Sequence, residues 1–282
     1  MRTEVERLEK RIRERFVKAF ATYRLLEDND RVLVGLSGGK DSLCLLEMLA
    51  KRAKIDRPKF QVEAVHVRMT NIQYETSTAY LEHFCQQLNV PLHIVTTSFS
   101  PAPATSAPAP IGPALAPAAP ATTLDGSPSG ASLSGTSPSP SGFEKKPACF
   151  LCSWYRRKQL FNLAQQLGCN KIALGHHQDD LLHTCLMNLF YQGRFDTMPA
   201  LLRMRKMPIS IIRPLCMVEE ADILRYAELR GYEKQVKLCP YEHDSHRHDM
   251  RQLFETLQQQ NAETRHSLWN AIVRDDKLVQ LS

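Results

Sequence analysis

The sequence predicts an α/β fold with a doubly wound parallel sheet, preceded by an N-terminal helix and followed by C-terminal helices. Short apolar runs typical of buried strands alternate with longer segments whose apolar residues recur at helical spacing. Polar turns follow two of these runs, at the carboxyl ends of strands where such sheets bind ligands. A composition of 43% hydrophobic and 23% charged residues agrees with a globular protein large enough to bury a core.

The first half of the chain predicts three helices and three strands. Residues 3–26 form the first helix, because Leu8, Ile12 and Phe16 recur at helical spacing. A buried strand at 31–36 then runs into a glycine-rich turn and an apolar helix at 43–53. The remaining elements of this half are strands at 60–67 and 92–96 and a helix at 75–88.

The second half continues the same alternation. Strands are expected at 171–175 and 209–212. Helices are expected at 150–167, 179–191, 218–230, 247–260 and 263–274. Gly231 follows the third of these helices and is a typical C-terminal stop.

An insert rich in Ala, Pro and Ser separates the two halves. Ten of the 17 prolines lie between Pro101 and Pro140, and Asp125 is the one charged residue between Phe99 and Phe143. Such a composition cannot bury enough apolar surface to form a core. We expect a disordered surface loop, or alternatively a flap over a binding site, rather than a boundary between two domains.

Charge and cysteine content indicate the compartment. The N-terminus is charged from its second residue, which argues against a secretory signal, and no run of about 18 apolar residues predicts a membrane span. Eight cysteines in such a chain indicate thiols or metal ligands rather than disulfides. We therefore expect a cytoplasmic protein without a membrane partner.

The net charge of +6 is concentrated in three basic clusters, at 7–18, 156–158 and 203–206. These clusters fit a polyanionic partner, and they fit ordinary solvated helix faces equally well.

A phosphate-binding loop is expected at Ser37-Gly38-Gly39-Lys40-Asp41-Ser42. It follows a strand and opens a helix, so backbone N–H groups and the helix dipole face an anion. It is not a Walker A loop, since Val34 and Asp41 stand where that pattern needs Gly and Ser or Thr. The string resembles the signature of the PP-loop ATP pyrophosphatase superfamily. That resemblance implies an adenine nucleotide alpha hydrolase-like fold and cleavage of ATP between its α- and β-phosphates.

A second polar turn, Gly175-His176-His177-Gln178-Asp179-Asp180, lies at the same predicted edge of the sheet. Asp179 or Asp180 is expected to cap the following helix. Either carboxylate also suits Mg²⁺, which prefers oxygen ligands and phosphate oxygens. The two histidines are expected to contact phosphate or to carry protons.

Cys149 and Cys152 form a C-x-x-C pair one helical turn apart, which suits a shared metal or cluster. A closed four-cysteine zinc site lacks its second pair, so a distant third ligand is required, and Cys239 in a polar loop is the best candidate. A structural or redox role for the pair is the alternative. The other five cysteines are expected in the core, namely Cys44, Cys85, Cys169, Cys185 and Cys216.

Taken in order, these motifs resemble the tRNA 2-thiocytidine synthetase family of PP-loop enzymes, together with Arg156-Arg157, Asn188 to Tyr191 and Arg213-Pro214-Leu215. The resemblance implies adenylation of the C2 oxygen of a tRNA cytosine at position 32 and its replacement by sulfur. It implies ATP, Mg²⁺ and a [4Fe-4S] cluster on Cys149, Cys152 and Cys239. It also implies tRNA and a sulfur donor such as a cysteine desulfurase as partners; a homodimer is compatible with it.

On this reading Lys40, Asp41 and Asp180 are catalytic, and Ser37 to Ser42 with Gly175 and His176 bind the nucleotide. The predicted organisation is a basic helix at 1–30, a nucleotide-binding domain at 31–260 interrupted by the insert at 99–145, and a C-terminal helix and tail at 261–282.

The chain departs from that family's pattern at 153–158, at 240–242 and at the strand end 66–69, where an aspartate is usual. Two other classes therefore stay open. One is another PP-loop enzyme, a 2-thiouridine synthetase or a lysidine ligase, and the other is a nucleotide-binding iron–sulfur redox sensor without enzymatic activity. The histidines at 243, 246 and 248 are expected to be exposed.

Overall fold

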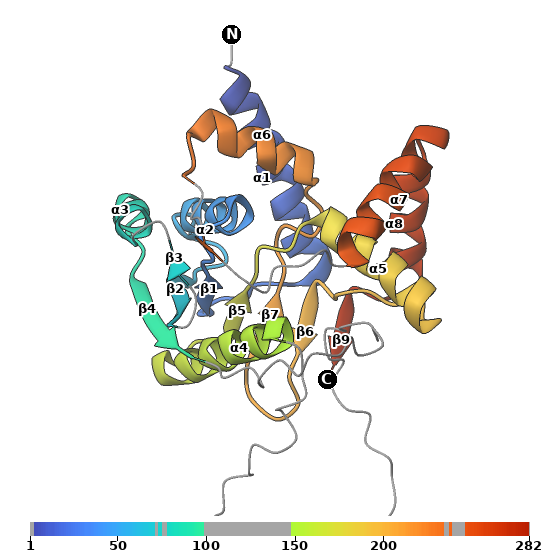
Figure 1. Cartoon of the computed structure of the whole chain (residues 1–282). Helices are drawn as coiled ribbons and strands as arrows, with labels where there is room; N and C mark the ends of the chain where they lie inside the picture. The colour runs from blue at the N-terminus through green and yellow to red at the C-terminus, as the bar shows by residue number, and fades with distance from the viewer. Residues whose placement is uncertain are drawn as a thin grey trace, which may run out of the picture.

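The computed structural model describes residues 3–70, 73–74, 78–98, 148–233, 237–238 and 246–281. Within these ranges the chain forms eight helices and nine strands (Figure 1). The predicted insert lies outside them, so its role as a loop or a flap stays a prediction.

The described strands build a seven-stranded, mostly parallel sheet in the order β4-β2-β1-β5-β7-β6-β9. The predicted α/β fold with a doubly wound sheet is therefore confirmed. Its five parallel core strands are adjacent, and β1 is the middle one, between β2 and β5. The predicted strands are β1 (Arg31–Gly35), β2 (Gln61–Met69), β4 (Leu92–Thr97), β5 (Lys171–Ala173) and β7 (Ser210–Ile212).

Four short strands were not predicted. β6 (Leu201–Arg203) pairs antiparallel with β7, and β9 (Val279–Leu281) pairs parallel with β6. β3 (Gln73–Tyr74) and β8 (Lys237–Leu238) form a separate two-stranded ribbon. Each has only two or three residues, which is too short for an alternating pattern to show in the sequence.

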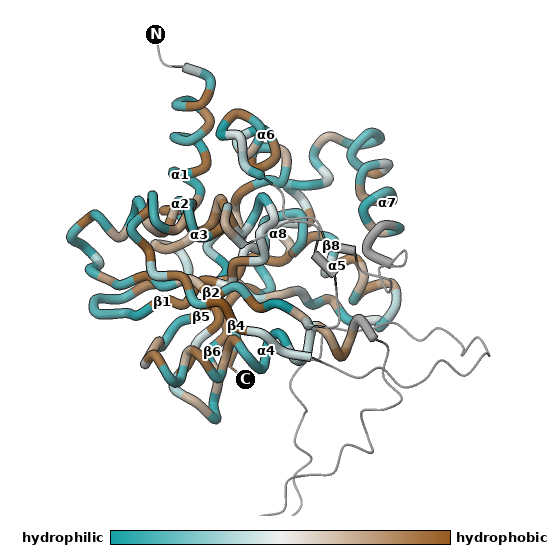
Figure 2. The backbone as a smooth tube through the Cα atoms, turned by 60° about the vertical axis from the view of Figure 1, so that its left-hand side comes forward, coloured by the Kyte–Doolittle hydropathy of each residue, from teal (hydrophilic) through white to brown (hydrophobic). Residues whose placement is uncertain are grey.

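Helices cover both faces of the sheet (Figure 1). On one face α4 packs its Ala164 and Leu160 against Leu33, Val65 and Ile172 of three neighbouring strands. The other helices share the larger core on the opposite face, and Figure 2 shows the most hydrophobic segments gathered in the central strands. The helices are α1 (Glu4–Tyr23), α2 (Lys40–Ala53), α3 (Ala79–Leu88), α4 (Ala148–Leu167), α5 (Gln178–Gln192), α6 (Glu220–Arg230), α7 (His246–Gln260) and α8 (Thr264–Arg274).

The N-terminal helix α1 is part of the main core. Its predicted apolar face is buried, and a capping box between Thr3 and Glu6 begins the helix. Part of its basic surface is used inside the fold, because Arg11 lies 2.5 Å from Asp222 of α6 and Arg15 lies close to the same helix. These two arginines therefore stabilise the packing of α1 on α6.

A buried carboxylate joins α2 to α6. Glu47 has no exposed surface, and its Oε1 lies 2.8 Å from Lys51 Nζ and 2.9 Å from Arg230 Nη2. The hydroxyls of Tyr226 and Tyr232 also donate to it. Burial opposes the charged form, but Lys51, Tyr232 and Arg230 outweigh it and lower the pKa of Glu47. The carboxylate is thus ionised and fully paired.

Candidate functional site

The loop between β1 and α2 has the geometry of an anion site. Gly38 adopts a φ of +83°, which glycine allows at no steric cost. Gly39 is the N-cap residue and brings no side chain to cap the helix, so the first-turn N–H groups face outward. The loop is held by its own hydroxyls, since Ser42 Oγ lies 3.1 Å from Ser37 Oγ and donates to the carbonyl of Gly39.

Gly175 packs directly against this loop. A Cβ on Gly175 would lie 3.1 Å from both the carbonyl carbon of Asp41 and the nitrogen of Ser42. The turn after β5 and the first turn of α2 therefore touch backbone to backbone. The structure thus brings together the two polar turns that the sequence predicts at one edge of the sheet.

Lys40 lies between two carboxylates. Its Nζ is 2.9 Å from Oε1 of Glu220 and 3.1 Å from Oδ1 of Asp41. Burial by itself would lower the pKa of Lys40, but the nearby carboxylates of Asp41 and Glu220 have the larger combined effect and raise it. Glu220 begins α6 and also pairs with Arg251 of α7. Sequence reasoning assigned no role to Glu220, although two acidic residues at the start of a predicted helix were a usable signal.

The helix after the second turn begins at Gln178, and His177 is its N-cap. The prediction that Asp179 or Asp180 caps this helix is wrong by two to three positions. His177 has extended backbone, and Asp180 sits three residues into the motif, where its carboxylate accepts from the backbone N–H of His177. Asp180 therefore closes a capping box instead of starting one.

The two aspartates of this turn have different surroundings. Asp179 is 7% exposed and accepts from Arg265 Nη2 at 2.6 Å and from the backbone N–H of Glu220 at 2.8 Å. Burial opposes its charge, but these partners prevail and lower the pKa of Asp179. Asp180 instead lies 3.5 Å from Nε2 of His177, whose ring also comes within 3.8 Å of Asp41.

Asp41 and Asp180 are the two carboxylates of these turns that have no arginine partner within ion-pair distance in the described part of the chain. Oδ1 of Asp41 is buried and accepts no hydrogen bond in the described part of the chain, although the Lys40 ammonium is near. Both oxygens of Asp179 already accept hydrogen bonds, Oδ1 from Arg265 and Oδ2 from the backbone N–H of Glu220. Among the described residues no three His, Cys, Asp or Glu side chains gather into a ready-made metal site. Phosphate oxygens would therefore have to complete the ligand set.

Arg213 and His176 meet where β7 and β5 end. Arg213 is 7% exposed, and its Nε donates to Nδ1 of His176 at 3.2 Å. Its Nη1 donates to the carbonyl of Pro199. Burial lowers the pKa of Arg213 to about 10. Sequence reasoning quoted Arg213 only as part of a motif, and an arginine at the carboxyl end of a buried strand was the signal for its role.

The three predicted cluster cysteines are described to different extents. Cys152 is half-buried on α4, and Cys149 lies one turn earlier in the same helix. Cys239 lies outside the described residues, but Leu238 before it pairs with Gln73, just beyond the carboxyl end of β2. Since α4 leads into β5, its first turn lies at that same edge of the sheet. The five cysteines expected in the core are buried, as predicted.

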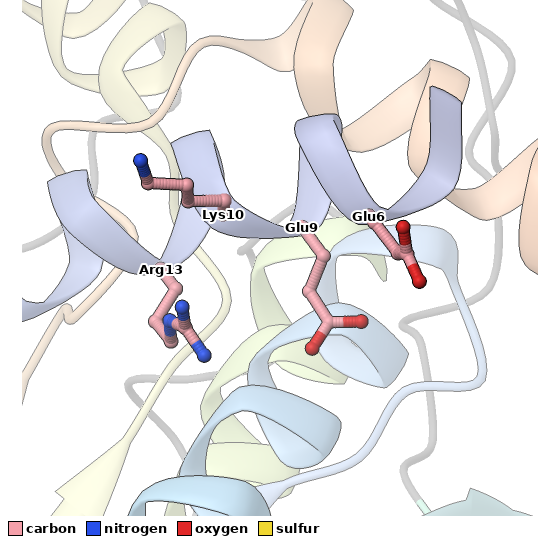
Figure 3. Close-up of a pocket in the computed structure, with 4 residues that line it drawn as sticks. All are labelled: Glu6, Glu9, Lys10 and Arg13. Carbon is pink, nitrogen blue, oxygen red and sulfur yellow. The ribbon is translucent and has the colours of Figure 1, made fainter. Parts of the chain in front are cut away.

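The basic clusters divide between paired and exposed groups. Arg203, Arg205 and Lys206 are exposed, and so is Lys158, whose ammonium lies 5.3 Å from the ring centroid of Trp154. On α1 a shallow hollow is lined by Glu6, Glu9, Lys10 and Arg13, and Figure 3 shows Glu9 and Arg13 projecting from one side of the helix. Two carboxylates and two cations give this hollow no net charge.

The exposure of the three histidines at 243, 246 and 248 stays a prediction, because their side chains lie outside the described part of the chain. No helix in the described ranges is long and apolar enough to cross a membrane.

Comparison with known proteins follows the same motifs. Residues 6–104 and 154–237 match the PP-loop domain family. The chain is 33% identical over 232 residues to a tRNA-cytidine(32) 2-sulfurtransferase of Bordetella avium, covering 82% of this chain and 62% of that relative. The enzyme of the same name in Aliivibrio fischeri is 31% identical over 255 residues, covering 90% and 71%. The chain thus spans somewhat less than two thirds of the first relative's length.

Among solved structures, the fold is similar to that of the U34-tRNA thiolase NcsA from Methanococcus maripaludis with its [4Fe-4S] cluster. The TM-score is 0.66 and the identity 22%, with 96% of this chain and 79% of that chain covered.

Proposed function

This chain belongs to the PP-loop family, and from that premise we propose that it is an ATP-dependent tRNA sulfurtransferase. It adenylates the C2 oxygen of a tRNA cytosine, at position 32, and replaces that oxygen with sulfur. The observation that carries the proposal is the outward-facing N-terminus of α2 at Gly39, with Lys40 beside it, between the parallel strands β1 and β5, where the order of successive strands changes from one side of β1 to the other. The named activity of the relatives supplies the base and its position.

The nucleotide step follows from the chemistry of the base. A carbonyl oxygen on a pyrimidine is a poor leaving group, so it first attacks the α-phosphorus of ATP and pyrophosphate departs. The loop at Ser37 to Ser42 receives the pyrophosphate on the N–H groups of the first turn of α2, and Lys40 offsets its charge. Asp41 and Asp180 would hold Mg²⁺ together with phosphate oxygens, and the ion would neutralise part of the same charge.

The sulfur step uses the activated base. Sulfide attacks C2, and the former carbonyl oxygen leaves with AMP, so the sulfur replaces the oxygen without a change of oxidation state of the base. Cys149, Cys152 and Cys239 are our proposed ligands of a [4Fe-4S] cluster, which when bound offers one open iron for the incoming sulfide. Two observations support this ligand set. Cys149 and Cys152 lie one turn apart on α4, and the β3–β8 ribbon ends at Leu238, one residue before Cys239.

The partners follow from this reaction. The substrate is tRNA, and the exposed ammonium of Lys158 on α4 would contact its phosphates. The sulfur comes from a donor of the cysteine desulfurase class, whose persulfide a thiol reductant must reduce to release the sulfide. The reaction takes place in the cytoplasm, and a homodimer is compatible with it. We propose the domain organisation given above, with one nucleotide-binding unit at 31–260 interrupted by the insert.

The deciding experiment is mass spectrometry of tRNA nucleosides from cells with and without the protein. Loss of 2-thiocytidine supports the proposal. Loss of 2-thiouridine or lysidine instead identifies another PP-loop enzyme, and an unchanged profile contradicts all three. With purified protein, AMP formation that depends on tRNA separates an enzyme from a redox sensor.

The cluster ligands have a test of their own. Protein purified without oxygen should absorb broadly near about 400 nm, and Cys239→Ala should remove that absorbance. Cys169→Ala is the matched control, because Cys169 is a buried core cysteine. A normal spectrum in Cys239→Ala would remove this cysteine from the site.

A further inference from the structure

Arg213 is a buried charge without a buried carboxylate beside it. Among the described residues no aspartate or glutamate lies within ion-pair distance of its guanidinium, and only 7% of the residue is exposed. A buried charge is costly unless hydrogen bonds compensate it. Here the compensation comes from the carbonyl of Pro199 and from the imidazole of His176. The side chain that accepts a hydrogen bond from this guanidinium is therefore that of His176.

The direction of this hydrogen bond fixes the state of the imidazole. A pKa of about 10 keeps Arg213 protonated at neutral pH, and a guanidinium has N–H donors but no acceptor. Nδ1 of His176 must therefore accept and carries no proton. The one proton of the neutral ring is then on Nε2.

Both residues are held in place by backbone contacts. The N–H of Leu174 donates to the carbonyl of Ile212 at 3.0 Å, and that of Gln178 donates to the carbonyl of Val218 at 2.9 Å. The segments that carry His176 and Arg213 therefore run side by side beyond β5 and β7. Gly175, directly before His176, touches the first turn of α2. The imidazole is thus next to the predicted phosphate loop.

We propose that Arg213 is a positioning residue that holds His176 as a neutral imidazole with its proton on Nε2, so that His176 donates a hydrogen bond to a nucleotide phosphate instead of acting as a base. This inference rests on the proposed function for the identity of the acceptor. A preset N–H donor stabilises negative charge as it develops at the α-phosphate during adenylation. A histidine free to take a second proton would lose its orientation each time it did so.

The first test reads the proton positions directly. The full chain labelled with ¹⁵N-histidine is examined by long-range ¹H–¹⁵N correlation at about pH 6, where an unperturbed imidazole is mostly doubly protonated. Charged groups act on Arg213 from two other elements: Asp180 of α5 favours its positive charge, and Arg157 of α4 opposes it. We expect His176 to show one unprotonated nitrogen, Nδ1, and one protonated nitrogen, Nε2.

In Arg213→Met the same ring should take up a second proton at that pH. The matched control is Arg274→Met, which removes an exposed arginine from the end of α8 and should leave the His176 signals unchanged. A doubly protonated His176 in the wild-type chain, or a proton on Nδ1, would overturn the inference.

The second test compares two amide side chains of different length at position 176. In His176→Gln the side-chain amide nitrogen takes the place of Nε2 and still donates, whereas the shorter His176→Asn reaches only the position of Nδ1. We expect tRNA-dependent AMP formation to fall about 100-fold in His176→Asn and in Arg213→Met, and less than about 10-fold in His176→Gln. Adding Arg213→Met to His176→Gln should cost little more, because Arg213 acts through the imidazole. Equal losses in Gln and Asn variants would contradict the donor role.

The two tests also separate this inference from the proposed function. The proton positions are measured without nucleotide or tRNA. If His176 has the expected state but the chain makes no AMP with tRNA, the proposed function fails and the arrangement of Arg213 and His176 stands. If AMP forms but the proton positions differ, only the inference fails.

Discussion

Gly175→Ala tests whether the contact between the two turns shapes the phosphate loop. The new Cβ would lie 3.1 Å from backbone atoms of Asp41 and Ser42, closer than the 3.4 Å at which ordinary contact begins. The backbone must therefore separate by a few tenths of an ångström. Such overpacking costs about 1–3 kcal/mol, which corresponds to a loss of roughly 2–12 °C in Tm for a protein of this size. The displaced nitrogen of Ser42 belongs to the first turn of α2, so we expect ATP to bind about tenfold more weakly, or about 1.4 kcal/mol.

The assay is isothermal titration calorimetry with ATP, accompanied by thermal unfolding. Gly193→Ala is the matched control: Gly193 has a φ of +63° at the end of α5, and a Cβ there meets no atom within 4 Å. That variant should lose about 1 kcal/mol of stability through its backbone alone and bind ATP normally. ATP affinity within twofold of wild type in Gly175→Ala would show that the close contact does not set the loop, and the reasoning would be refuted.

Three further predictions concern charged groups. Glu220→Gln frees Lys40 from one of its two carboxylates, so ATP should bind about two- to fivefold more tightly at low salt, and calorimetry at two salt concentrations should show the difference shrinking. The folded-state pKa of Glu47 is lowered, so its contribution to stability is present above the ordinary carboxyl pKa and is lost as pH falls through the lowered value. The Glu47→Gln variant should therefore unfold at a lower urea concentration than wild type at pH 7, and its stability should fall less than that of wild type on acidification. Arg15→Met should lower Tm by a few degrees through its lost contacts with α6, while tRNA affinity measured by filter binding changes less than twofold.

The sequence predicted the elements that carry strong periodicity or a strong turn motif. The five core strands and the helices around Leu8 to Tyr23 and Leu43 to Ala53 were placed to within a few residues, because each buries a continuous apolar face. The loop at Ser37–Ser42 was found because strand, glycines and helix are local features. The meeting of this loop with Gly175 followed from the rule that parallel strands end at one edge.

What the sequence did not predict depends on distant contacts. Glu220 meets Lys40 only because α6 packs beside α2, and Arg213 meets His176 only because β5 and β7 are neighbours. Local pattern also misplaced the cap of α5, since aspartate is the usual cap and here the histidine before it adopts the extended backbone. The basic face of α1 resembled a surface for a polyanion until its arginines were seen to pair with Asp222 and Glu219.

The backbone contact between Gly175 and the first turn of α2 also has a consequence for folding. The two turns come from strands on opposite sides of the long insert, so no fragment that ends before β5 contains both. A nucleotide that needs both turns recognises only chains in which β1 and β5 have already paired. By mass action it then stabilises the complete sheet against partly folded forms, and the rise in Tm with ATP concentration measures how cooperatively the two halves assemble.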